Sequence, residues 1–209
     1  MYEFLGSLFL YPSEDDIADL VAASVEVRRE SDLMADLPFL PRLRVVLDLL
    51  EELAEDARKR LEEEYIDLFV VGASQAPCPP YESAYVDGKG LEKGLVAVEV
   101  ERAYAASGAR LATPGELPDH AALELAFLSV LCAEEAQAWR EAHLEWARDC
   151  LRRERAFHDE HLQRWFPTFA RRVSGVAQTS FYRQLAGAAR AFVIHDRGLI
   201  QALFERGFV

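Results

Sequence analysis

Asp119 and His120 are adjacent residues whose carboxylate and imidazole could work as a general acid and base. With Cys78 as a nucleophile, the same pair would support covalent catalysis. The neighbouring residues favour helix capping, because Pro118 fixes the approach of the chain and Asp119 is a good N-cap. A capping role for these residues does not exclude a role in binding. A catalytic role is disfavoured, because two adjacent residues at a helix start rarely converge on one substrate. We therefore predict that the chain is not an enzyme and has no catalytic residues.

The histidines are the next residues that could support chemistry. A di-iron site in a helical bundle needs Glu-x-x-His units, and none of the five histidines follows a glutamate at that spacing. His158 and His161 stand three apart on an expected helix and could share a metal. Without an evident third ligand, two solvated or capping histidines are the favoured interpretation. We predict no metal site.

The stretch of about residues 71–90 is rich in proline and glycine and predicts a long ordered loop. Loops of this length inside compact domains are functional or disordered. Tyr81 and Tyr85 argue against disorder, because aromatic side chains anchor a loop by packing. Glu82 between them has two open interpretations. It belongs to a rigid turn packed on the bundle, or it accepts a partner's arginine.

Apolar residues recur at helical spacing along most of the chain, and no internal repeat or alternating strand pattern interrupts them. The clearest apolar stripe runs over residues 41–69 and predicts an amphipathic helix there. Ser13 is the expected N-cap of an early helix, and Gly108 is an expected C-cap. Further helices are expected over residues 2–11, 91–107, 119–146, 150–164 and 178–205, with a second break at about 109–118 and a connection punctuated by Pro167 and Gly175. We predict one all-α helical bundle domain over residues 1–209.

The charge balance limits the class of partner. The chain has 36 Asp and Glu against 23 Lys and Arg, a net charge of −13. Such a surface repels a phosphate backbone, so nucleic acid is not an expected partner. It would attract a basic peptide and speed its association, although solubility is the favoured explanation of the charge taken alone.

The cysteines and the apolar runs bear on the compartment. The three cysteines are widely spaced and form no C-x-x-C pair, which is typical of a reducing compartment. The first residues lack the pattern of a signal peptide, and no apolar run approaches the roughly 20 residues that span a bilayer. We predict a cytoplasmic protein that is not an integral membrane protein.

Three blocks of sequence resemble those of a known family. The first comprises residues 64–70 (EYIDLFV) and 78–85 (CPPYESAY), and the second comprises residues 100–104 (VERAY) and 117–128 (LPDHAALELAFL). The third, residues 157–169, contains the spacing His-Leu-x-x-Trp-x-Pro-x-Phe. Together, and in this order, the blocks resemble the TorD/DmsD/NarJ family of molybdoenzyme-specific chaperones, also called redox enzyme maturation proteins.

This resemblance implies an all-helical cytoplasmic chaperone. Such proteins bind the N-terminal twin-arginine or signal-like segment of a molybdopterin oxidoreductase subunit and hold it until the cofactor is inserted. The resemblance places signal-peptide binding on Leu68, Phe69, Tyr81, Glu82, Asp119 and His120. It also implies ancillary binding of guanine nucleotide or molybdopterin. No phosphate-binding loop is present in the sequence, and we predict that the protein has no cofactor. A helical adaptor without a molybdoenzyme client is the alternative, and both a monomer and a homodimer stay open.

Overall fold

The computed structural model describes residues 1–34, 36–53, 55–70, 76–86, 91–110 and 115–207. Most of them are helical: α1 (Tyr2–Ser7), α2 (Glu14–Asp32), α3 (Leu40–Glu51), α4 (Glu55–Tyr65), α5 (Leu91–Ala106), α6 (Ala121–Arg140), α7 (Leu144–Phe157), α8 (Gln163–Val176) and α9 (Ser180–Glu205). Three short turns join them, the π-turns η1 (Ile66–Val70) and η3 (His158–Leu162) and the 3-10 turn η2 (Glu82–Ala84). Apart from one isolated bridge, these described residues contain no β structure. The prediction of an all-α fold is confirmed.

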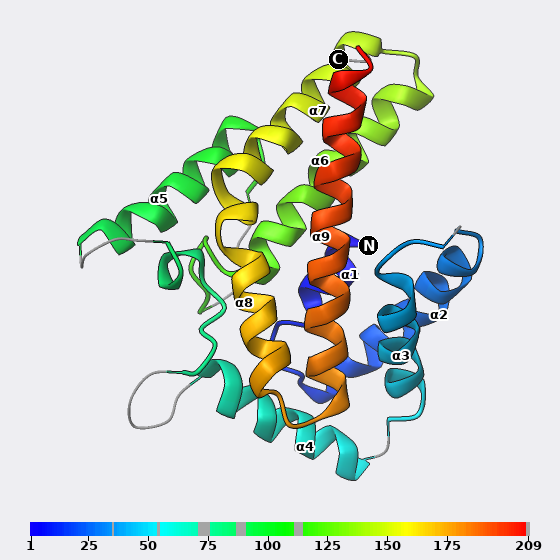
Figure 1. The fold of residues 1–209 in the computed structure, drawn as a ribbon, viewed down its shortest axis with the longest axis vertical. Coiled ribbons are helices and arrows are strands. Elements are labelled where there is room, and N and C mark those ends of the chain that lie inside the picture. Colours follow the sequence, from blue (N-terminus) through cyan, green and yellow to red (C-terminus); the bar gives the residue numbers. More distant parts are fainter. Residues whose placement is uncertain (35, 54, 71–75, 87–90, 111–114, 208–209) are drawn as a thin grey trace.

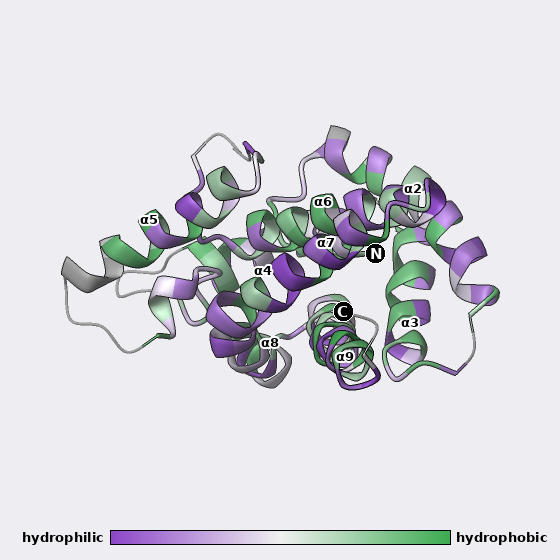
Figure 2. Ribbon diagram, turned by 90° about the horizontal axis from the view of Figure 1, so that it is seen from above, coloured by the Kyte–Doolittle hydropathy of each residue, from purple (hydrophilic) through white to green (hydrophobic). Residues whose placement is uncertain are grey.

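Helices α6 to α9 form the body of the molecule (Figure 1). Helix α6 packs against α7, and α8 packs against α9. Helix α1 packs on α6, α3 packs on α9, and α2 covers α3. Both views place α5 at one edge of this body and the pair α2 and α3 at the opposite edge (Figure 1 and Figure 2). Helices α2 and α5 are therefore peripheral, while the start of α6 lies inside.

Aromatic side chains from distant parts of the chain form the centre of the core. The ring centroid of Phe9 lies 6.0 Å from that of Phe166 and 5.4 Å from that of Phe169. Phe69 joins them and lies edge-on to Tyr182 with centroids 5.5 Å apart. Tilted and edge-on pairs at these separations add to the stabilisation that burial alone provides. The cluster thus fastens the end of α1 and the turn η1 to α8 and α9.

Two predicted helix ends are confirmed. The Ser13 hydroxyl accepts a hydrogen bond from the Asp16 backbone N–H at 3.3 Å and so caps α2. Gly108 follows α5 with a φ of 73°, the left-handed conformation that glycine adopts without steric cost. The first helix is shorter than predicted and ends at Ser7.

The stripe over residues 41–69 is not one helix. Helix α3 ends at Glu51, α4 begins at Glu55, and the chain changes direction between them (Figure 1). The prediction was wrong because an apolar stripe reports the helical period but not the direction of the helix axis. Two consecutive helices whose apolar faces stay in phase look like one.

The helix predicted to reach residue 146 ends at Arg140, and α7 begins at Leu144. The turn between them contains Ala142 at a φ of 58°, in the left-handed region where glycine is usual. Since neither glycine nor proline marks this turn, the sequence carries no signal for it.

Pro167 was predicted to lie in a connection between two helices, and this prediction is wrong. It lies inside α8. The helical path runs from α7 through the π-turn η3 into α8 and ends at Val176. A proline ring removes one backbone hydrogen bond and crowds the preceding turn. The π-turn directly upstream changes the hydrogen-bond register, which lets the helical path accommodate the proline.

None of the helices in the described part of the chain has both the length and the apolar composition that a membrane span requires.

Candidate functional site

Backbone hydrogen bonds fix the loop of residues 76–86 against the start of α6. The Glu82 N–H donates to the carbonyl of Asp119 at 2.9 Å, and the Ala121 N–H donates to the carbonyl of Pro80 at 2.8 Å. An isolated antiparallel bridge lies between these two bonds. The loop and the helix start therefore form one rigid corner.

The Asp119 side chain caps the turn η2 across this corner. Its Oδ2 accepts a hydrogen bond from the Ser83 backbone N–H at 3.0 Å. The prediction that Asp119 caps α6 is wrong, because His120 occupies the N-cap position and its Nδ1 accepts from the Ala122 N–H at 3.1 Å. An N-cap needs only a side-chain acceptor that faces the second helical N–H, and an unprotonated imidazole nitrogen meets this need.

The His120 imidazole is enclosed in the corner. Its ring lies edge-on to Tyr81 with centroids 5.1 Å apart, and its Nε2 lies 3.8 Å from Oε2 of Glu116. The Tyr81 hydroxyl donates to the same carboxylate. Burial lowers the pKa of His120, and the nearby carboxylates of Glu116 and Asp119 oppose this effect. The ring is therefore held neutral, with Nδ1 as its acceptor.

The Glu82 carboxylate is engaged inside the molecule. It is 1% exposed, and its Oε2 lies 2.9 Å from Nδ1 of His161 on η3. Glu124 on α6 is fully buried and accepts a hydrogen bond from the Trp165 indole N–H at 2.9 Å. Burial, and secondly the negative charge of Glu82, raise the pKa of Glu124 well above its ordinary value. This buried cluster connects η2, α6, η3 and α8.

Sequence reasoning did not assign Glu124, His161 or Trp165 to the site. A signal for Glu124 exists, because it is the charged residue in the otherwise apolar run of residues 121–128. A carboxylate on a fully buried helix face requires hydrogen-bond partners. The identity of those partners depends on the tertiary fold.

Leu68 and Phe69 belong to the core at the base of the loop. Their side chains are 4% and 5% exposed, and the carbonyl of Leu68 accepts the Cys78 N–H at 2.9 Å. Further along, Tyr85 packs on Trp165 with centroids 5.6 Å apart. The loop is thus anchored by aromatic packing, as predicted for the residues that the structure describes.

The structure brings together four of the six predicted binding residues, namely Tyr81, Glu82, Asp119 and His120. Leu68 and Phe69 lie below them in the core. Five of the six side chains are at most 5% exposed, and Tyr81 alone is partly exposed. In this conformation the carboxylates of Glu82 and Asp119 both bond to groups within the protein and so stabilise the fold.

The geometry does not support acid–base or thiol catalysis. The Asp119 carboxylate is bonded to the Ser83 N–H and does not orient the His120 ring. Cys78 is completely buried, and this burial raises the pKa of its thiol to about 11. A thiol with that pKa is protonated at neutral pH and is a poor nucleophile.

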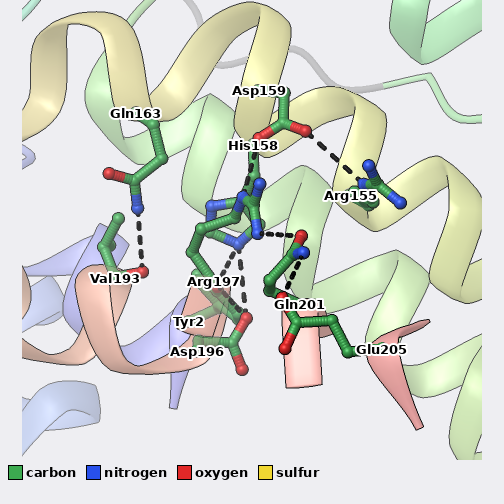
Figure 3. Close-up of polar contacts among 10 residues, drawn as sticks. All are labelled: Tyr2, Arg155, His158, Asp159, Gln163, Val193, Asp196, Arg197, Gln201 and Glu205. Atoms are coloured by element: carbon green, nitrogen blue, oxygen red, sulfur yellow. Dashed lines mark hydrogen bonds and ion pairs between the residues drawn. The ribbon is translucent and has the colours of Figure 1, made fainter. Parts of the chain in front are cut away.

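His158 and His161 face different partners. The His158 Nε2 lies 2.8 Å from the Tyr2 hydroxyl and 3.3 Å from Oδ2 of Asp196. Figure 3 draws both contacts. His161 points to Glu82 instead. The wider π-turn makes two side chains three residues apart diverge, so they do not form a pair of metal ligands. Among the residues that the structure describes, no three His, Cys, Asp or Glu side chains are grouped to hold a metal ion.

Comparisons with known proteins agree with the fold and the motifs. The family model for the nitrate reductase delta subunit matches residues 34–171. The TorD chaperone of Vibrio cholerae is 32% identical over 98% of this chain and 92% of its own length. A selenate reductase assembly chaperone of Thauera selenatis is 35% identical over 61% of this chain and 64% of its own length.

A crystal structure of a protein from Archaeoglobus fulgidus, described as a redox enzyme maturation protein, has the same fold. It superposes with a TM-score of 0.59 at 23% identity and covers 92% of this chain and 91% of its own. The relatives are chaperones, which confirms the prediction that the chain is not an enzyme. The chain belongs to the TorD/DmsD/NarJ family of molybdoenzyme-specific chaperones.

Proposed function

We propose that the protein is a cytoplasmic chaperone that binds the N-terminal, twin-arginine or signal-like segment of a molybdopterin oxidoreductase subunit. It holds that subunit until the cofactor is inserted and the enzyme is assembled. The observation that carries this proposal is the match to the Vibrio cholerae TorD chaperone, which extends over 98% of the chain. The relative from Thauera selenatis, described as an assembly chaperone for selenate reductase, supports an oxidoreductase subunit as the client.

Physical chemistry supports a cationic client segment. A net charge of −13 attracts arginine-rich peptides and speeds their encounter. The three cysteines are free, which suits the reducing cytoplasm. In this proposal the chaperone acts without a resident cofactor, and the sequence contains no phosphate-binding loop motif.

The corner that contains Glu82 and Asp119 has a positioning role in this proposal. Five of the six residues assigned to client binding are buried, so they would act by holding the loop against α6 and α8. Tyr81 is the member whose partly exposed side chain can touch a client directly. Direct contact of the other five would require the corner to open.

Calorimetry tests the proposed function. Peptides that cover the N-terminal segments of the molybdopterin oxidoreductase subunits encoded in the source genome are titrated into the full chain. One of them should bind with a negative heat-capacity change and with an affinity that falls as salt increases. Its scrambled version, which has the same composition and charge, is the control. Equal binding of the native and scrambled peptides for every subunit would contradict the proposal and favour a helical adaptor with another partner.

A further inference from the structure

A groove of about 440 Å³ lies between α1, α2 and α6, and none of its lining residues belongs to the corner described above. Ser7 and Ser129 contribute its neutral polar atoms. Its apolar lining comes from Met1, Phe4, Leu10, Leu20, Ala23 and Val27. The volume is within the range of sites that bind small molecules, so the groove can receive a few side chains of a partner.

The rim of the groove is acidic. Four carboxylates line it, those of Glu3, Asp16, Asp19 and Glu26, and no lysine or arginine is among the described residues of the lining. All four residues are exposed. A cationic side chain at this rim would therefore meet several negative charges beside an apolar surface, where charged hydrogen bonds are strengthened by partial desolvation.

The nearby arginines leave these charges largely uncompensated. Arg29 lies 3.7 Å from Glu26, but both side chains are mostly exposed, and such pairs contribute little. Arg28 is directed to the neighbouring helix α3, where it bonds to Asp48 at 2.8 Å and to Glu51 at 2.7 Å. Among the described residues of the lining, Met1 adds one positive charge through its α-amino group, so the four carboxylates leave the groove with a net negative potential.

Helix α2 contributes both acidic and apolar side chains to the groove. At 3.6 residues per turn, the acidic and apolar residues that line the groove fall within about one third of the helix circumference. The carboxylates of Asp19 and Glu26 lie toward one side of this sector, and the side chains of Leu20 and Val27 lie toward the other, so the groove follows the boundary between the charged and the apolar side of α2. A face that carries both is suited to a ligand that is itself both cationic and apolar.

We propose that this groove binds the part of the client's N-terminal segment in which arginine side chains precede apolar ones. The inference rests on the proposed function and names the surface that would perform it. The arginines contact Asp19, Glu26 and the neighbouring carboxylates, and the apolar side chains that follow enter the groove against Phe4 and Leu20. Charge complementarity sets the orientation, and burial of the apolar side chains adds affinity.

The test uses the full chain and a synthetic fluorescent peptide of about 25 residues, with two adjacent arginines followed by a leucine- and alanine-rich stretch. A second peptide carries glutamines in place of the arginines. The double variant Asp19→Asn/Glu26→Gln should bind the arginine peptide about tenfold more weakly, and the glutamine peptide unchanged. The variant Ala23→Trp, which fills the groove, should weaken both peptides by at least about tenfold.

The matched control is Glu63→Gln/Glu101→Gln, which removes the same two charges from exposed positions on α4 and α5. The affinities of this variant for both peptides should stay within about twofold of the wild-type values. Such a result would show that the effect of the groove variants comes from where the charges lie and not from the net charge of the molecule. Circular dichroism confirms that each variant is folded. Because the groove residues changed are exposed, the double variant tests the inference even if Ala23→Trp does not fold.

The outcomes separate the inference from the proposed function. If the wild-type chain binds the arginine peptide and the client peptides no better than scrambled ones, the proposed function fails and the inference fails with it. If wild-type binding is clear but the groove variants match the control variant, only the groove assignment is overturned. If Ala23→Trp changed the oligomeric state of the protein without peptide, the groove would be an interface between copies of the chain. That outcome would also overturn the groove assignment.

Discussion

The Oε2 atom of Glu82 lies 2.9 Å from Nδ1 of His161, although 79 residues separate the two along the chain. Both side chains are buried, at 1% and 7% exposure. A buried polar pair of this kind is stable only while both members are present, because removal of one leaves the other without its partner. The pair joins the loop of residues 76–86 to the π-turn η3.

We expect Glu82→Ala to lower the free energy of unfolding by about 2–3 kcal/mol, since it leaves the His161 imidazole buried without its acceptor. Glu82→Gln keeps an acceptor at nearly the same place and should cost about 1 kcal/mol or less. Urea denaturation measures both. A double-mutant cycle with His161→Ala should give a favourable coupling energy. Additive losses in that cycle would show that the two side chains do not interact in solution.

The hydrogen bond between Asp119 and the Ser83 N–H predicts a similar contrast. Asp119→Ala should lower stability by about 1–2 kcal/mol, because the N–H of η2 loses its acceptor. Asp119→Asn retains an oxygen acceptor and should cost less than about 1 kcal/mol. Neither change should alter the affinity for a client peptide beyond its effect on folding. Weaker binding by Asp119→Asn at unchanged stability would instead support direct contact between this carboxylate and a client arginine.

The fold was predictable from sequence to the extent that it depends on local spacing. Helical periodicity identified an all-α chain, and the choice of Ser13 and Gly108 as capping residues was correct because capping depends on neighbours in the chain. The break between α6 and α7 was missed because Ala142 adopts a conformation that its side chain disfavours. Local backbone hydrogen bonds hold that turn, from the Ala142 N–H to the carbonyl of Trp139 and from the His143 N–H to the carbonyl of Ala138, and no residue type in the sequence marks them.

The site was predictable in part for the same reason. Short motifs identified Tyr81, Glu82, Asp119 and His120, and the structure gathers them in one corner. The buried polar contact of Glu82 is made with His161 on η3, about 80 residues away along the chain, and the motif does not report it. The groove was missed because the acidic residues of α2 look like a solvated face until the apolar residues of α1 are placed beside them.

The pKa of His120 predicts an acid-sensitive contribution to stability. Burial lowers this pKa in the folded state, so the unfolded chain binds more protons as the solution is acidified. The contribution is complete above about pH 6.5 and is lost as the pH falls toward the folded-state pKa. His120→Asn retains a capping acceptor but cannot be protonated. The difference in unfolding free energy between wild type and variant should therefore shift in favour of the variant between about pH 7 and 5, and a constant difference would contradict the prediction.

Glu154 predicts the opposite dependence on pH. Burial, and then the charges of Glu135 and Asp196, raise its pKa from 4.5 to about 9, while Arg153 opposes the shift. A raised carboxyl pKa gives a contribution that is complete below about pH 4.5 and is lost as the pH rises through about 9. Glu154→Gln should thus be more stable than wild type at pH 8 by on the order of a few kcal/mol, and should differ little at pH 5. Thermal unfolding at both pH values checks this, with exposed Glu63→Gln as the control that should show no such difference.

The last prediction concerns the Tyr2 hydroxyl, which bonds to His158 at 2.8 Å and to Asp196 at 2.7 Å and so ties α1 to η3 and α9 (Figure 3). Tyr2→Phe keeps the ring, which lies edge-on to Phe192 with centroids 4.6 Å apart, and removes only the hydroxyl. The free energy of unfolding should fall by about 1–3 kcal/mol, because the buried imidazole of His158 and the carboxylate of Asp196 lose a shared hydrogen-bond partner. Tyr11→Phe provides the control, since its side chain is 46% exposed and the change should stay within about 0.5 kcal/mol. Equal effects of the two substitutions in urea denaturation would show that the bonds of Tyr2 do not anchor α1. Since α1 forms one wall of the groove, a destabilising Tyr2→Phe should also weaken binding of the arginine peptide, and Tyr11→Phe should not.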